Sequence, residues 1–80
     1  MKKTWKQMKI ESMQHNYGHH IEEFKGHKDD RLVYVNIYNS IMEALESLPE
    51  EPHSYIRVAM FRQLNKDKEV LNDIIYRFCD

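Results

Sequence analysis

The sequence predicts an all-α protein, a small bundle of three to four helices. Apolar residues recur at spacings of three and four through most of the chain, which is the signature of helices that bury one face. Only two glycines and two prolines interrupt the 80 residues, so there are few places to turn. A chain of this length holds one domain with a modest core. We therefore expect residues 1–80 to form a single helical domain, in which residues 1–9 could be a mobile basic arm.

The first helix is expected from about residue 4 to residue 25. It has a narrow apolar stripe made of Ile10, Met13, Tyr17, Ile21 and Phe24. Trp5 and Met8 lie off this stripe, so either the regular helix starts after them or they touch something else. Gly18 lies inside the helix at a cost of about 1 kcal/mol relative to alanine. Gly26 is suited to end the helix.

A second helix is expected from Asp29 to Leu48, where prolines then stop it. Asp29 and Asp30 are good N-cap residues and suit the positive end of the helix dipole. The β-branched segment 32–35 alone would suit a strand, but helical spacing continues after it. The apolar arc covers about 200°, whereas a typical surface helix buries about 100°. Such a helix must pack against two neighbours, or against one neighbour and another subunit.

The third helical stretch starts near Pro52. Its inner face is expected to contain Ile56, Met60 and Leu64. The same register continued to the C-terminus would place Asp67 in the apolar stripe, where an unpaired carboxylate is costly. We therefore expect a break at residues 65–66, with Asp67 capping a fourth helix over residues 68–78. A single bent helix is the alternative.

The composition argues against several classes of protein. The formal net charge is −1, so the chain as a whole has no basic field for nucleic acid. The single cysteine, Cys79, cannot form an internal disulfide and fits a reducing compartment. No stretch approaches the roughly 20 apolar residues of a membrane span, and no signal peptide is evident. We expect a cytoplasmic protein with no membrane association.

One group of residues has ligand types suited to a metal ion. His15 and His19 are four residues apart and Glu22 follows one turn on, so an α-helix would place all three on one face. Two imidazoles and a carboxylate could hold zinc. The glutamate of the H-E-x-x-H motif is absent between these histidines, however. We therefore expect solvent-facing histidines and no cofactor.

Catalytic patterns are missing from the sequence. No serine has the glycine-flanked elbow of a hydrolase, and there is no glycine-rich phosphate loop. Cys79 lies one residue from the chain end, where a pre-organised pocket is hard to build. We expect no enzymatic activity.

Two ligand-binding functions remain open beside protein binding. A basic face on the last two helices could contact nucleic acid, in the outline of a helix-turn-helix. Its residues would be Arg57, Arg62, Lys66 and Lys68. Acidic residues on the last helix and the negative net charge argue against it. A nucleotide site between subunits of an oligomer, formed by arginines and tyrosines, is the other possibility.

The large apolar side chains exceed what the expected core can hide. Tyr34 and Tyr38 lie one turn apart, either as core residues with hydroxyls reaching water or as an interface. A second apolar strip lies off the main stripe of the last two helices and includes Cys79. The residues expected to contact a partner are Trp5, Met8, Tyr34, Tyr38, Val58, Phe61 and Tyr76.

The leading hypothesis from the sequence is a small non-catalytic helical regulator or inhibitor. It would act by binding another protein and would itself form a homo-oligomer. Surplus apolar surface and missing catalytic residues motivate this hypothesis.

Overall fold

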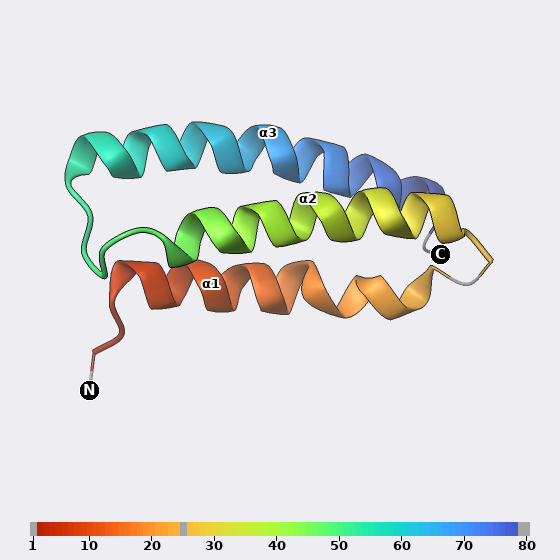
Figure 1. The fold of residues 1–80 in the computed structure, drawn as a ribbon, viewed down its shortest axis with the longest axis horizontal. Coiled ribbons are helices and arrows are strands. Elements are labelled where there is room, and N and C mark those ends of the chain that lie inside the picture. The colour runs from red at the N-terminus through yellow and green to blue at the C-terminus, as the bar shows by residue number, and fades with distance from the viewer. Residues whose placement is uncertain (1, 25, 79–80) are drawn as a thin grey trace.

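Three helices packed side by side form the protein. The computed structural model describes residues 2–24 and 26–78. Its helices are α1 (Trp5–Asn16), the 3₁₀ helix η1 (Gly18–Glu23), α2 (Lys28–Glu46) and α3 (Ser54–Phe78). They run up, down and up, so α1 and α3 point the same way on either side of α2 (Figure 1). The predicted all-helical bundle is confirmed, with no strand in the part of the chain described.

The wide apolar arc of α2 is buried by both of its neighbours, since α2 contacts α1, η1 and α3. Tyr34, Ile41 and Leu45 point into the core and are almost completely covered. Leu32 and Val33, at the start of the arc, stay exposed. The apolar arc is therefore buried mostly by two neighbouring helices of the same chain, which is the first of the two predicted arrangements.

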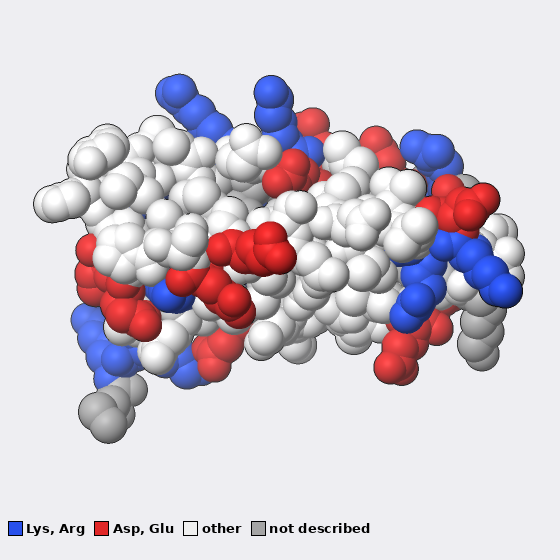
Figure 2. Space-filling view, viewed as in Figure 1, with Lys and Arg blue, Asp and Glu red and all other residues white. Residues whose placement is uncertain are grey.

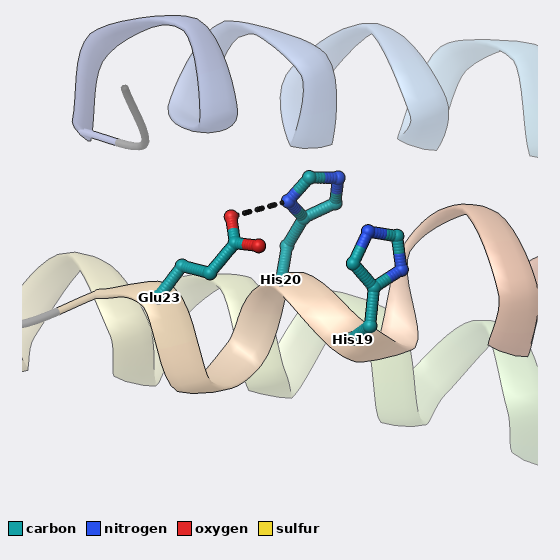
Figure 3. Close-up of side chains that lie close together, drawn as sticks. All are labelled: His19, His20 and Glu23. Atoms are coloured by element: carbon teal, nitrogen blue, oxygen red, sulfur yellow. Dashed lines mark hydrogen bonds and ion pairs between the residues drawn. The ribbon is translucent and has the colours of Figure 1, made fainter.

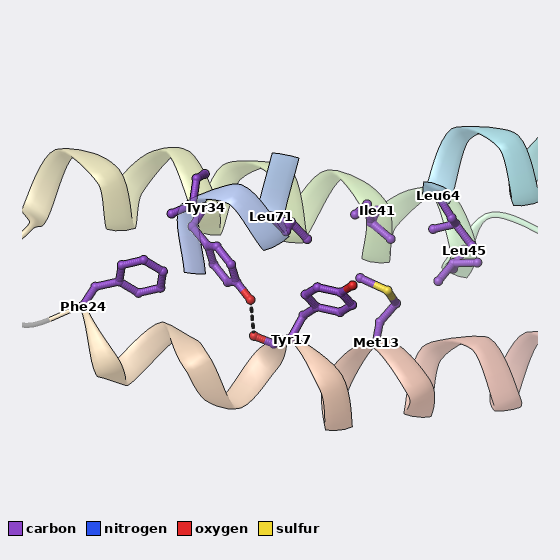
Figure 4. Close-up of a cluster of buried hydrophobic side chains, with 9 residues drawn as sticks. Met13, Tyr17, Phe24, Tyr34, Ile41, Leu45, Leu64 and Leu71 are labelled. Atoms are coloured by element: carbon purple, nitrogen blue, oxygen red, sulfur yellow. Dashed lines mark hydrogen bonds between the residues drawn. The ribbon is translucent and has the colours of Figure 1, made fainter. Parts of the chain in front are cut away.

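The core lies along α2 between the other two helices (Figure 4). Its buried members are Met13, Tyr17, Phe24, Tyr34, Ile41, Leu45, Leu64, Leu71 and Ile74. The predicted stripe of the first helix is confirmed, because Met13, Tyr17 and Phe24 are buried in the core and the other two members, Ile10 and Ile21, pack against its edge. The bundle measures 41 × 26 × 18 Å along its principal axes.

The first helical stretch changes geometry in the middle, which the sequence pattern did not predict. The α-helix ends at Asn16, and after Tyr17 the chain continues as the 3₁₀ helix. The Tyr34 hydroxyl donates a buried 2.6 Å hydrogen bond to the Tyr17 carbonyl at this point. A Cβ atom on Gly18 would lie 2.9 Å from the Tyr38 hydroxyl oxygen. The change therefore occurs where two tyrosines of α2 approach the backbone of the first helix.

The turn between η1 and α2 contains the glycine that was predicted there. The N-cap of α2, however, is a different residue from the predicted one. Gly26 has a φ of 80°, a conformation that glycine adopts without the strain of a side chain. The N-cap of α2 is His27, which makes no side-chain capping bond. Asp29 and Asp30 lie in the first turn instead, so the prediction that they cap the helix is wrong. Their charges still lie at the positive end of its dipole.

The predicted break in the last helical stretch is also wrong, because α3 is continuous from Ser54 to Phe78. Asp67 does not cap a new helix. Its carboxylate accepts two 3.3 Å bonds from the Gln63 amide, one turn earlier, and is only half-buried. It lines a shallow polar notch with Asn36 and Ser40 of α2. The carboxylate is thus paired and partly hydrated, so the helix can pass through without a break.

Replacing Gly18 by alanine tests the close approach of Tyr38. The φ of Gly18 is not positive, so the obstacle to a side chain is the tyrosine ring. We expect Gly18→Ala to lower the free energy of unfolding by about 1 kcal/mol through overpacking. In a Tyr38→Ala background the same change should become neutral or stabilise by up to about 1 kcal/mol, as alanine normally does in a helix. Urea unfolding followed by circular dichroism measures both; an equal effect in the two backgrounds would contradict the contact.

Removing the Tyr34 hydroxyl tests the bond to the Tyr17 carbonyl. We expect Tyr34→Phe to lower the free energy of unfolding by about 0.5–1.5 kcal/mol, because a buried hydrogen bond is lost while the Tyr17 carbonyl keeps its 3.3 Å bond from the His20 N–H. Tyr76→Phe is the matched control, since its side chain is 89 % exposed and should change stability by less than about 0.5 kcal/mol. Thermal or urea unfolding of both variants gives the comparison. Equal effects would show that the buried bond contributes nothing.

Candidate partner-binding site

The N-terminus of α1 is held against the loop that connects α2 and α3. Thr4 caps α1 in a capping box with Gln7, and its hydroxyl also donates to Glu50 at 2.7 Å. The Trp5 backbone N–H donates to the Glu51 carboxylate. The Lys6 ammonium donates to two carbonyls at the end of α2. The carboxylates of Glu50 and Glu51 lie at the positive end of the α1 dipole, which favours their contact with the start of this helix.

This contact places Trp5 beside the first turns of α3. The Lys9 ammonium and the Arg57 guanidinium lie 5.5 and 5.6 Å from the centroid of the Trp5 ring, within cation–π range. Arg57 is also held by its own neighbours: Nε donates to the Pro52 carbonyl at 2.7 Å, and Nη2 lies 3.8 Å from Glu51. The aromatic ring and the two cations are thus positioned by the loop before α3.

A hollow of about 320 Å³ opens over these side chains, and we call it the Trp5 hollow. Its lining consists of Trp5, Lys9, Arg57, Val58, Phe61 and Arg62. Val58 and Phe61 are exposed there, Phe61 by 60 %. No acidic residue is among those that line it. The hollow therefore combines an apolar floor with a cationic rim.

The structure brings together some of the residues predicted to contact a partner. Trp5, Val58 and Phe61 meet in the Trp5 hollow. Met8 is exposed on α1 outside its lining, and Tyr76 is exposed near the other end of α3. Cys79 lies outside the described residues. Whether residues 1–9 move as an arm stays a prediction.

The two tyrosines of α2 belong to the core. Tyr34 is 0 % exposed and packs on Phe24 with ring centroids 4.9 Å apart. Its hydroxyl bonds to a backbone carbonyl instead of reaching water, so it is unavailable to a partner of the folded chain. The prediction of Tyr34 as a contact residue is corrected accordingly. Tyr38 is half-buried, and this burial raises the pKa of its phenol above 10.0.

The four predicted nucleic-acid-binding residues do not share one face. Arg57 and Arg62 line the Trp5 hollow. Arg62 also lines a shallow depression further along the exposed side of α3, together with Lys66 and Glu69. Lys68 is half-buried and stands about 200° around the helix from Lys66. Sequence reasoning had missed Lys9, whose contact with Trp5 depends on how α1 meets α3.

The histidines assemble in a different register from the predicted one. The chain changes to 3₁₀ geometry at Gly18, and although His15 and His19 still line one depression, Glu22 is not among the residues that line it. His19, His20 and Glu23 cluster instead, and His20 Nδ1 lies 2.8 Å from Glu23 Oε2. Glu22 is exposed and is not part of this cluster.

None of the helices formed by the described residues combines the length and the apolar character needed to cross a bilayer.

Comparison with known proteins found no matching family model, no matching curated protein and no matching solved structure.

Proposed function

We propose that this chain is a non-catalytic binding protein, a regulator or inhibitor that docks a partner protein in the Trp5 hollow. The observation that supports this proposal is the solvent-open lining of the hollow, which combines the apolar Trp5, Val58 and Phe61 with the cationic Lys9, Arg57 and Arg62. Tryptophan and arginine are the residues most enriched where interfaces derive their affinity. Exposed apolar side chains rimmed by polar ones are typical of such surfaces.

The chemistry of the hollow suggests the chemistry of its occupant. An aromatic or aliphatic anchor would bury Val58 and Phe61, which are exposed in the free chain. Carboxylates beside that anchor would meet the cations of the rim. Arg62 forms no ion pair with another residue in the described ranges, so it is available for one. The proposed occupant is therefore an acidic, amphipathic segment of another protein.

Nucleic acid fits this surface less well. Phosphate binding is built from several cations along one face, and here Lys68 lies about 200° around α3 from Lys66. The depression that Arg62 and Lys66 share is also lined by the acidic Glu69. The apolar floor would also be left without a partner along a sugar–phosphate backbone.

A phage-displayed library of random peptides, panned on the immobilised protein, tests the docking proposal. We expect enrichment of sequences that pair aspartate or glutamate with aromatic or aliphatic residues. A synthetic consensus peptide should bind the Phe61→Asp variant at least about tenfold more weakly, equivalent to about 1.4 kcal/mol. Val70→Asp is the matched control, because Val70 is also exposed on α3 but lies outside the hollow. Calorimetric titration gives the affinities.

Three outcomes would count against the proposal. The consensus could be basic, or the peptide could bind Phe61→Asp and the parent equally well. The chain could also bind a random 20-nucleotide DNA or a DNA duplex at physiological salt and lose that affinity steeply as salt rises. The last result would favour the nucleic-acid alternative.

The outer face of α3 supports the expected homo-oligomer through its order of charges. Arg62 and Lys66 lie in the first half of this face and Glu69 and Asp73 in the second, and none of the four forms an ion pair with another described residue. Figure 2 shows basic, then acidic and then again basic side chains along the edge that α3 occupies. A second copy of α3 packed antiparallel would set Arg62 opposite Asp73 and Lys66 opposite Glu69, so this dimer and a partner in the Trp5 hollow would compete for Arg62. It would also bring the exposed Tyr76 towards Val58.

A charge-swap series tests this pairing. We expect light scattering to give twice the chain mass of 9.8 kDa for the parent at high protein concentration. Arg62→Asp and Asp73→Arg should each shift the equilibrium to monomer, because each places like charges opposite one another. The double variant should restore the dimer, since the symmetric pair then has its charges exchanged. A parent that stays monomeric, or a double variant no better than the single ones, would contradict the pairing.

A further inference from the structure

Three potential metal ligands lie close together on η1. Figure 3 shows the His20 ring between the Glu23 carboxylate and the His19 ring. One donor atom from each residue can be chosen so that all three lie within 4.8 Å of one another. The two imidazole rings have centroids 4.0 Å apart, and His20 Nδ1 lies 2.8 Å from Glu23 Oε2. Two nitrogens and one oxygen are thus gathered within the segment from His19 to Glu23.

The 3₁₀ geometry aligns two members of this cluster. A 3₁₀ helix has three residues per turn, so side chains at positions i and i+3 stand directly above one another. His20 and Glu23 have this spacing. In an α-helix, with 3.6 residues per turn, the same two residues would be about 60° apart around the axis. The local change of helix type therefore places the His20 and Glu23 side chains in closer register than an α-helix would.

The segment that carries the cluster is held in place by α2. The Tyr34 hydroxyl binds the Tyr17 carbonyl just before η1, at 2.6 Å. Nε of Arg31 donates to the Ile21 carbonyl, in the middle of η1, at 3.0 Å. The His20 side chain is 23 % exposed, so its neighbours also restrict it. A site on a restrained segment loses less conformational entropy when it binds a ligand.

We propose that His19, His20 and Glu23 form a binding site for a divalent transition-metal ion, Zn²⁺ in the first place. Imidazole and carboxylate are ligands that zinc accepts, at bond lengths of about 2.0–2.2 Å. Tetrahedral donors at that radius are about 3.3 Å apart, so small side-chain rotations from the observed spacing suffice. The ion would take the place of the proton between His20 Nδ1 and Glu23 Oε2, and water would complete the coordination. This site does not depend on the Trp5 hollow.

Titration of the untagged protein with ZnCl₂ in a calorimeter tests the site, with CoCl₂ as a spectroscopic probe of tetrahedral coordination. We expect one ion per chain and a melting temperature that rises with zinc concentration. His20→Ala and Glu23→Gln should each weaken binding at least about tenfold. Binding should also weaken from pH 7.5 to pH 5.5, because protons compete with the metal for the imidazoles.

Two matched variants separate this site from nonspecific binding. Glu22→Gln removes the neighbouring exposed carboxylate that an α-helical register would have used, and His53→Ala removes a histidine at the start of α3. Both should change the zinc affinity less than twofold. The proposal is overturned if Glu22→Gln weakens binding as much as Glu23→Gln, or if the parent shows no saturable 1:1 binding. Circular dichroism of each metal-free variant would show that the fold is unchanged.

Discussion

The rest of the structure depends on α2, because this helix has apolar residues on two sides and both sides must be buried. A helix that is apolar over about 200° cannot be satisfied by a single neighbour. In this chain α1 and α3 cover α2 from either side, and the up–down–up path makes them run in the same direction. The starts of α1 and α3 therefore meet at one end of the bundle. That meeting sets Trp5 beside Val58 and Phe61, so the candidate docking surface follows from how the core is covered.

Towards the opposite end of the bundle, two tyrosines of α2 contact the backbone of the first helical stretch. The α2 helix approaches the first helix closely enough for the Tyr34 hydroxyl to bond the Tyr17 carbonyl, while a Cβ atom at position 18 would lie 2.9 Å from the Tyr38 hydroxyl oxygen. The Tyr17 carbonyl also accepts a bond from the His20 N–H, three residues on, as in a 3₁₀ helix. The change of helix type, which sets the position of His20, thus coincides with these tertiary contacts.

What the sequence could predict was set by periodicity. The spacing of apolar residues gave the helices and most of the core, because burial of one face is a repeated, local pattern. Features that depend on single contacts between residues far apart in the sequence could not be predicted from this spacing. Asp67 appeared incompatible with a continuous α3 until Gln63 and the polar notch on α2 accounted for its carboxylate. Likewise, the spacing of apolar residues gives no sign that Glu50 and Glu51 hold the start of α1.

The place of Trp5 gives the molecule an optical property. It is the single tryptophan of the chain and lies in the lining of the hollow, with two cations over its ring. Ultraviolet emission excited beyond the tyrosine band therefore comes from that one position. Its wavelength and intensity depend on the charges and water next to the indole, so the light reports on the state of this end of the bundle without any added dye.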